Sequence, residues 1–359
     1  MNRLIRLTAV LGSLLGMPVL LQAQNETPPR APISPNYPAW AYAIPAPPAP
    51  GSQPSPATVE DGTLFSVPGS SYQFTASKIR GRLDTDPDVR VAPADWFPED
   101  HPVMPKIVAE GDNARKISAC SSCHLPNGKG RPENAPPAAQ SKEYILMTLM
   151  DMKNGLRGSA DPRKNNTKNM ITFAKEMTAQ EMEDVAEYYA AMKWTPWITV
   201  KETAQVPKMR SANGMWLPLT GSNAGMEPIG MRVIETPEDV ELAEKLKSPR
   251  SGFIAYVPVG SVAKGKAMVT TGDNGKTLAC TLCHGADLHG VGSIPGIAAR
   301  SPSYNARQLF DYQAGTRKGV MAELMKPVVE NLTNEDFVNI TAYLASLPAQ
   351  AQTPTFTTE

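Results

Sequence analysis

The sequence predicts a mainly α-helical protein with two copies of one domain, a small β-containing connector between them and a proline-rich N-terminal extension. Three observations predict this fold class. The chain matches itself after a shift of 160 residues, each copy ends in an apolar stripe at helical spacing, and eleven prolines lie between Pro28 and Pro56. The expected segments are 1–23, a signal peptide; 24–100, a proline-rich tether and irregular segment; 101–195, the first domain; 196–258, the connector; 259–350, the second domain; and 351–359, a tail.

The internal repeat extends over most of both domains. After a five-residue gap the shift changes from 160 to 155 residues, and the matches continue to the end of each copy. A repeat of this length indicates a duplicated domain of about 90 residues. The matched pairs include Ala119/Ala279, Tyr144/Tyr304, Leu149/Leu309, Asp151/Asp311, Gly155/Gly315, Arg157/Arg317, Met170/Met325, Thr178/Thr333 and Tyr188/Tyr343.

The last helix of each copy has a clear start signal. Thr178 and Thr333 are N-cap candidates, and an acidic residue, Glu181 or Asp336, follows three positions later. This spacing predicts a capping box, in which the two side chains satisfy each other's backbone N–H groups. Helices are also expected over residues 144–157 and 304–317.

The first 23 residues have the pattern of an export signal. Arg3 and Arg6 precede an uncharged apolar run from Leu7 to Leu21, and Ala23 is the expected cleavage residue. The alternative is a membrane anchor, but the run is short for a span of ~20 residues. We therefore expect a periplasmic protein without a stable membrane span. The balance of 35 basic and 35 acidic residues gives no field that would attract nucleic acid.

The proline-rich segment allows two interpretations. Its composition predicts an extended, stiff tether of polyproline II type. Alternatively, the interspersed aromatic residues Tyr37, Trp40 and Tyr42 hold it against a domain or a partner. The connector, in contrast, predicts short strands at residues 198–200, 231–234 and 253–257, with turns at Asn213-Gly214 and Ser251-Gly252.

The four cysteines of the chain lie in two C-x-x-C-H motifs, at residues 120–124 and 280–284. This motif is the attachment signature of c-type haem, because two thiols at this spacing reach the two vinyl groups and the next residue, a histidine, reaches the iron. The alternatives are a redox dithiol and a zinc site. A dithiol does not need the histidine, and a zinc site would need both pairs to converge, although each belongs to its own domain. The sequence therefore predicts two covalently attached haem c groups.

Methionine is the expected sixth ligand of each iron. Met170 lies seven residues before Met177, and Met325 lies seven residues before Leu332. Met177 and Leu332 directly precede the threonines expected to begin the last helices, and no other methionine pair keeps this spacing. Met321 is the competitor in the second copy. A His/Met pair raises the reduction potential, as suits an electron carrier. Of the remaining histidines, His289 is expected in an exposed loop and His101 on the surface, with ligation as the less favoured alternative.

These residues carry a resemblance to a known family. Each copy resembles a class I cytochrome c domain, over residues 102–194 and 259–349, and the pair resembles a tandem diheme cytochrome c. The resemblance implies that a proline carbonyl, from Pro136 or Pro137 and from Pro295, orients each proximal histidine. It also implies thioethers at Cys120, Cys123, Cys280 and Cys283, and axial pairs His124/Met170 and His284/Met325. The extension and the connector depart from the family, so the resemblance does not imply how the two haems face each other.

Three functions fit this pattern. The favoured one is electron transfer without catalysis, between a periplasmic dehydrogenase or other donor and a terminal acceptor, with both irons six-coordinate. The second is a diheme oxidoreductase, peroxidase-like or oxidising a sulfur compound, with one open or weakly ligated haem. The third is a cytochrome subunit of a larger dehydrogenase, docked through the extension or the connector.

A group of basic residues near Met170 could attract an acidic partner, or it could be a solvated loop. These residues are Arg157, Arg163, Lys164 and Lys168.

Overall fold

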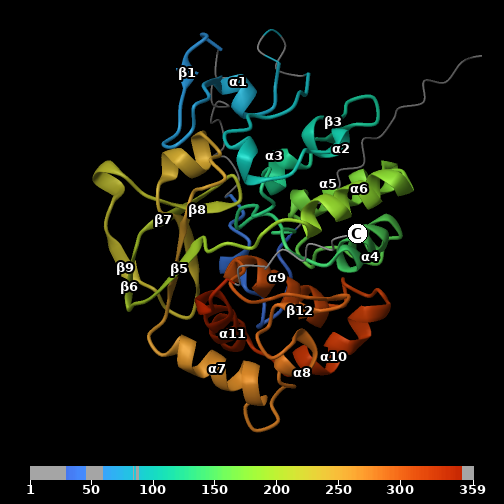
Figure 1. Cartoon of the computed structure of the whole chain (residues 1–359). Helices are drawn as coiled ribbons and strands as arrows, with labels where there is room; N and C mark the ends of the chain where they lie inside the picture. Colours follow the sequence, from blue (N-terminus) through green and yellow to red (C-terminus); the bar gives the residue numbers. More distant parts are fainter. Residues whose placement is uncertain (1–29, 46–59, 84, 86–88, 350–359) are drawn as a thin grey trace, which may run out of the picture.

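The computed structural model describes residues 30–45, 60–83, 85 and 89–349. The predicted signal peptide at residues 1–23, the tail at 351–359 and the proline-rich stretch from 46 to 59 lie outside these residues. Two helical units, a β-containing connector and a small N-terminal layer make up the described chain (Figure 1).

The first helical unit surrounds the first C-x-x-C-H motif. Its elements are α2 (Lys106–Ala109), β3 (Gly111–Asp112), β4 (Ile117–Ser118), α3 (Ser121–His124), α4 (Lys142–Lys153), α5 (Asn165–Glu176) and α6 (Ala179–Ala190).

The second helical unit has a similar order of helices around the second motif, but its β-hairpin follows the motif helix, and a 3₁₀ helix with a short α-helix stands in place of α5. Its elements are α7 (Ser261–Thr271), α8 (Thr281–His284), β12 (Gly290–Val291), β13 (Ile294–Pro295), α9 (Pro302–Gln313), the 3₁₀ helix η5 (Val320–Met325), α10 (Lys326–Val329) and α11 (Asn334–Ser346).

The predicted helix starts are confirmed. Thr178 begins α6 and Thr333 begins α11, each with both hydrogen bonds of a capping box. The helices expected over residues 144–157 and 304–317 form as α4 and α9, two residues earlier at the start and four earlier at the end. They end early because a glycine with positive φ, Gly155 or Gly315, follows each of them.

The two units differ most in their first helix. In the second unit, α7 has eleven residues and lies directly on α11. Gly265 permits this contact, since a Cβ there would lie 1.9 Å from the carbonyl oxygen of Asn339. In the first unit the corresponding helix α2 has one turn of four residues. The last helix of the first unit, α6, therefore packs mainly on α4 and only slightly on α2.

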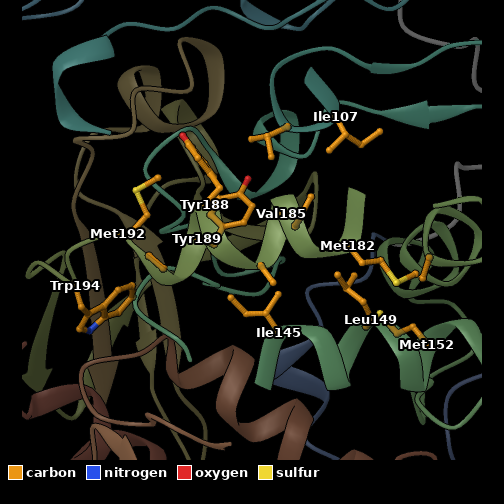
Figure 2. Close-up of a cluster of buried hydrophobic side chains, with 14 of the residues drawn as sticks. Ile107, Ile145, Leu149, Met152, Met182, Val185, Tyr188, Tyr189, Met192 and Trp194 are labelled. Atoms are coloured by element: carbon orange, nitrogen blue, oxygen red, sulfur yellow. The ribbon is translucent and has the colours of Figure 1, made fainter. Parts of the chain in front are cut away.

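The core of the first unit lies between α4 and α6. Figure 2 shows Ile145 and Leu149 of α4 facing Met182 and Val185 of α6, with Ile107 of α2 above them. These residues keep the three- and four-residue spacing of an amphipathic helix face. The same cluster continues through Trp194 and Trp197 into the connector, where it includes Met215, Leu217 and Phe253.

The connector is a set of small sheets that contacts both units. The strand β11 pairs in parallel with β5 and antiparallel with β10, while β7 pairs with β8 and β6 with β9. The predicted strand at 253–257 is confirmed exactly, that at 198–200 is extended by two residues, and that at 231–234 was wrong because β10 begins only at Ile234. Its strands are β5 (Ile198–Glu202), β6 (Gln205–Pro207), β7 (Met209–Ala212), β8 (Met215–Pro218), β9 (Met226–Pro228), β10 (Ile234–Pro237) and β11 (Phe253–Val257), with the short helices η3 (Gly221–Asn223) and η4 (Glu241–Lys245).

The predicted turn at Asn213-Gly214 joins β7 to β8. Both residues have positive φ, +51° and +79°. Such a two-residue loop matches the twist of a β-hairpin, and glycine and asparagine are the residues that tolerate it.

The two helical units meet directly at a junction. There the main chain of Arg157 pairs antiparallel with that of Arg317.

Residues 30–45 are not a tether. Tyr37, Trp40 and Tyr42 belong to the hydrophobic core of the second unit, and Tyr42 is 1% exposed. The indole of Trp40 donates to Asn334 Oδ1 at 2.9 Å, and the hydroxyl of Tyr37 donates to Asp161 of the first unit. The stiff-tether interpretation was wrong for these residues, because buried aromatic surface outweighs the preference of proline for solvated, extended chain.

Residues 60–100 form a small layer with its own core. Trp96 and Phe97 lie at the centre of this core, since both side chains are 1% exposed. The indole of Trp96 donates to the carbonyl of Leu246 at 2.7 Å, which joins this layer to the connector. The elements of the N-terminal part are η1 (Ala39–Ala41), β1 (Leu64–Phe65), β2 (Phe74–Thr75), α1 (Ala76–Ile79) and η2 (Pro98–Asp100).

His101 is not a surface residue, contrary to expectation. Its side chain is 4% exposed and its Nε2 lies 3.2 Å from both oxygens of Asp95. The ring also packs edge-on against Tyr188 of α6. His101 therefore joins the N-terminal layer to the first unit. In the described part of the chain, no helix is long and apolar enough to cross a membrane.

Replacing Trp40 tests the packing of the N-terminal segment. Because Trp40 is only 7% exposed, we expect Trp40→Ala to lower the free energy of unfolding by about 3–5 kcal/mol. Urea unfolding followed by circular dichroism measures this. Ile33→Ala is the matched control, since Ile33 is fully exposed in the same segment and its loss should change stability by less than about 0.5 kcal/mol. Equal stability of the two variants would contradict the packing.

His101 should make stability depend on pH. Burial lowers its pKa, but the hydrogen bonds to Asp95 and to the Pro102 carbonyl outweigh burial and leave the pKa raised. The resulting stabilisation is fully present below the unfolded pKa of about 6.5 and is lost as pH rises through the folded pKa. As pH rises from below about 6.5 to above the folded pKa of His101, we expect the urea midpoint of the wild type to fall more than that of His101→Gln. Parallel pH profiles would show that the Asp95 contact contributes nothing.

Candidate haem sites

The first C-x-x-C-H motif lines a cavity inside the first unit. Cys120 is the N-cap of α3, so the one-turn helix places Cys123 and His124 on the same side of the cavity. His124 Nδ1 lies 2.8 Å from the carbonyl oxygen of Ala135. This contact fixes the ring and leaves Nε2 available as a ligand. The carbonyl comes from Ala135, not from Pro136 or Pro137, so that prediction was off by one residue.

The second motif repeats the arrangement. Cys280 is the N-cap of α8, and Cys283 and His284 line a cavity with Pro295. His284 Nδ1 lies 2.7 Å from the carbonyl oxygen of Pro295, as predicted. The two units therefore orient the histidine in the same way, through a carbonyl eleven residues further on.

The chemistry of these groups suits a covalently bound metal macrocycle. Burial lowers the pKa of both His124 and His284, which keeps each imidazole neutral and able to bind a metal. Burial raises the pKa of the Cys120 thiol to about 12 and of the Cys280 thiol to about 11. A reactive dithiol shows the opposite shift. Nor do the pairs converge on one zinc ion, because each lines its own cavity.

A methionine lines each cavity at the matched position of the repeat. Met170 lies within α5, and Met325 ends the 3₁₀ helix η5. Met321 also lines the second cavity, so geometry leaves both candidates of that unit in place. Met152 and Met177 similarly line the first cavity.

The other two histidines line neither cavity. His101 lies with Asp95 and Tyr188, and His289 Nδ1 lies 2.8 Å from the carbonyl of Asp287 within the loop after α8. Both histidines therefore lie outside the two cavities, each with hydrogen-bond partners of its own.

The two cavities meet at the junction between the units. Gln140, Tyr144, Tyr304 and Gln308 line both of them. Gln140 and Gly296 hold the two sides together by reciprocal hydrogen bonds of 2.8 and 2.9 Å. Two groups bound in these cavities would therefore have a common border, which the sequence did not indicate.

Two buried arginines at this border lack carboxylate partners within the described chain. Arg157 donates to Thr148, Tyr304 and Gln308, and Arg317 donates to Gln308, all of them neutral. Arg157 and Arg317 are 5% and 8% exposed. Asp151 and Asp311 act on both arginines electrostatically without forming an ion pair with either. A buried cation is stabilised by a direct anionic partner. The propionate groups of haem would supply such partners, so the residues present fit two haem groups.

The basic residues near Met170 are neither an exposed patch nor a solvated loop. Arg157 and Lys164 are buried, and Lys164 Nζ donates to the carbonyl of Glu133 at 2.8 Å. Arg163 pairs with Asp161 at 2.7 Å, and Lys168 alone of the four is exposed. Both interpretations of this group were therefore wrong. The informative signal was the exact match of polar residues in the repeat, Tyr144 with Tyr304 and Arg157 with Arg317, which identifies the junction.

Comparison with known proteins gives the class. The sequence model described as "Cytochrome c" matches residues 108–193 and 262–348. Cytochrome c-554(548) of Halomonas halodenitrificans is 38% identical over 68 residues, which are 19% of this chain and 82% of that protein. The chain therefore belongs to the cytochrome c family.

Two longer relatives match about two thirds of the chain. Cytochrome c4 of Azotobacter vinelandii is 24% identical over 247 residues, 67% of this chain and 90% of that protein. A thiosulfate dehydrogenase electron acceptor of Thiomonas intermedia is 23% identical over 238 residues, 65% of this chain and 80% of that protein. This chain is a tandem diheme class I cytochrome c, mainly α-helical, with two covalently attached haem c groups and a role in electron transfer.

Proposed function

We propose that this protein is a periplasmic electron carrier in which both irons have histidine and methionine as axial ligands. Thioethers form at Cys120 and Cys123 in the first unit and at Cys280 and Cys283 in the second. Bound in this way, each haem supplies a one-electron iron(III)/iron(II) couple. The chain determines the ligands, the potentials and the access to them.

The axial pairs in this proposal are His124 with Met170 and His284 with Met325. The observation that carries it is the presence of a methionine at the matched repeat position in both cavities. Thioether sulfur is a soft, neutral ligand that favours the reduced iron. In the second unit we favour Met325 over Met321 because Met325 keeps the spacing of the repeat.

The junction gives a route for electrons between the two sites. Arg157 lines the first cavity and Arg317 the second, and both lie at the common border, where they can bind the haem propionates. Tyr144 and Gln140 are buried at the same border, with the partly buried Tyr304 and Gln308 beside them, so the border gives little access to water. A dry, preorganised environment lowers the solvent rearrangement that accompanies a change in charge.

We further propose that the donor is a periplasmic dehydrogenase and that the protein passes electrons to a terminal acceptor, either freely or as a subunit of that dehydrogenase. The relative named as a thiosulfate dehydrogenase electron acceptor makes an enzyme of that kind the first donor to test. The signal peptide expected at residues 1–23 supports the periplasmic location. Residues 30–45 do not serve as a docking segment, because Trp40, Tyr42 and their neighbours pack within the molecule.

Ligation can be tested by the methionine-to-iron charge-transfer band of the oxidised protein. In the wild type we expect the band intensity per protein to correspond to two methionine-ligated haems. In Met170→Leu or Met325→Leu it should fall to about half, because each variant removes one thioether ligand. Absorption and magnetic circular dichroism measure the intensity, with total haem determined separately.

The matched controls are Met177→Leu and Met321→Leu, which change a neighbouring methionine of the same cavity. Full intensity is expected in both. Loss of the band in Met321→Leu, and not in Met325→Leu, would move the second ligand to Met321. A high-spin, ligand-exchangeable haem in the wild type would overturn the proposal and favour the diheme oxidoreductase instead.

A further inference from the structure

The two haem sites differ in what covers the edge that carries the C-x-x-C motif. The first cavity is lined, beside Cys123, by residues from outside the first unit. These are Arg80, Gly81, Arg90 and Val91 of the N-terminal layer and Lys247 of the connector, which we call the cover. The second cavity has no such lining among the described residues: apart from Gln140, Tyr144 and Met147, its walls come from residues 277–344.

The cover lies in close contact with the motif itself. Gly81 has φ +65°, and a Cβ there would lie 3.4 Å from Ser122 Oγ and 2.9 Å from the Val91 carbonyl oxygen. Figure 1 shows α1, which immediately precedes the cover, above α3, whereas α8 lies at the opposite end of the molecule. In the repeat, Ser122 corresponds to Leu282, and Leu282 is 74% exposed. Ser122 is partly buried, so this edge is more covered in the first unit than in the second, while Cys123 and Cys283 are themselves exposed in both.

Several contacts hold the cover in place. The N–H of Val91 donates to the Gly81 carbonyl at 3.0 Å, which joins the two N-terminal parts of the cover. Asn113 of the first unit donates to the Arg90 carbonyl at 2.7 Å. On the other side, the indole of Trp96 holds the carbonyl of Leu246, the residue before Lys247. The N-terminal layer and the connector thus bring their parts of the cover together.

The cover is cationic. It carries Arg80, Arg90 and Lys247, and burial beside Arg131 lowers the pKa of Lys247 to about 8. Among the described residues, neither Arg80, Arg90 nor Lys247 forms an ion pair with a carboxylate. Positive charge near a redox centre favours the form with the additional electron, and exclusion of water disfavours the oxidised, more positive iron. Both effects raise the reduction potential of the site.

The open edge of the second site has the opposite character. Exposed apolar side chains line it or lie on the segments beside it, and two lysines of these segments are paired, Lys276 with Asp336 and Lys326 with Glu323, at 2.7 Å each. The apolar residues are Leu278, Leu282, Val291, Val320 and Leu324, which are 48–87% exposed. Such a surface suits transient contact with a redox protein whose own face is apolar and carries little charge.

We propose that the cover closes the first haem to external redox partners and holds its potential above that of the second haem, so that electrons enter the chain at the second haem. The first haem then exchanges electrons only through the junction. This inference rests on haem attachment at the two motifs and is independent of which methionines are the axial ligands.

The potentials test the cover directly. In Arg80→Gln/Arg90→Gln/Lys247→Gln, we expect the higher of the two midpoints to fall and the lower to stay, in a spectroelectrochemical titration of the diheme protein. The control Lys201→Gln/Lys208→Gln/Arg210→Gln removes the same charge from exposed positions of the connector and should move neither. A fall of the lower midpoint, an equal fall of both, or no change would overturn the proposal.

Access is tested by a second measurement, which does not involve electron transfer. A neutral paramagnetic chelate in solution should broaden the haem-methyl NMR signals of one haem in the wild type and of both in Gly81→Ala, whose Cβ displaces the loop. Equal broadening of both haems in the wild type would overturn the closed edge. The charge-transfer band serves as the check that ligation is intact, so failure of this inference is distinct from failure of the proposed function.

Discussion

Main-chain hydrogen bonds between residues 156–158 of the first unit and 316–318 of the second determine how the two halves of the molecule are arranged. Gly158 N–H donates to the Thr316 carbonyl and Lys318 N–H donates to that of Leu156, both at 2.8 Å. Because the paired segments occupy the same place in the repeat, the pairing brings like parts of the two units face to face. A buried peptide group without a partner costs about as much as a lost hydrogen bond, so the pairing resists opening. The common border of the cavities and the paired position of the two arginines follow from it.

Around this symmetric junction the rest of the chain is asymmetric. The N-terminal layer and the connector both add residues to the first unit, whose own first helix has a single turn. The second unit keeps the long α7 against α11 and receives residues 37–42 on another side. Duplication gave two similar sites, and the added segments made their surroundings different. In the proposed role of the cover, differences in potential and access come from the segments that lie outside the repeat.

The features predicted correctly from the sequence are those with a local or periodic signal. The capping boxes at Thr178 and Thr333 and the strand at 253–257 each follow from a few neighbouring residues. The errors concern contacts between distant segments. Composition could not show that Trp40 reaches Asn334, or that His101 is enclosed by Asp95 and Tyr188. The proximal carbonyl was misplaced by one residue, from Pro136 to Ala135, because loop geometry is not periodic.

The packing of residues 30–45 also constrains the order of assembly. In the proposed export to the periplasm, this segment would cross the membrane ahead of residues 60–349, whereas its partners Arg307 and Asn334 lie near the other end of the described chain. Contacts between residues so distant in sequence form late, because the intervening loop must first close. Both C-x-x-C-H motifs would then be accessible for haem attachment before the N-terminal segment docks. Docking of this segment would then be the step that completes the mature fold.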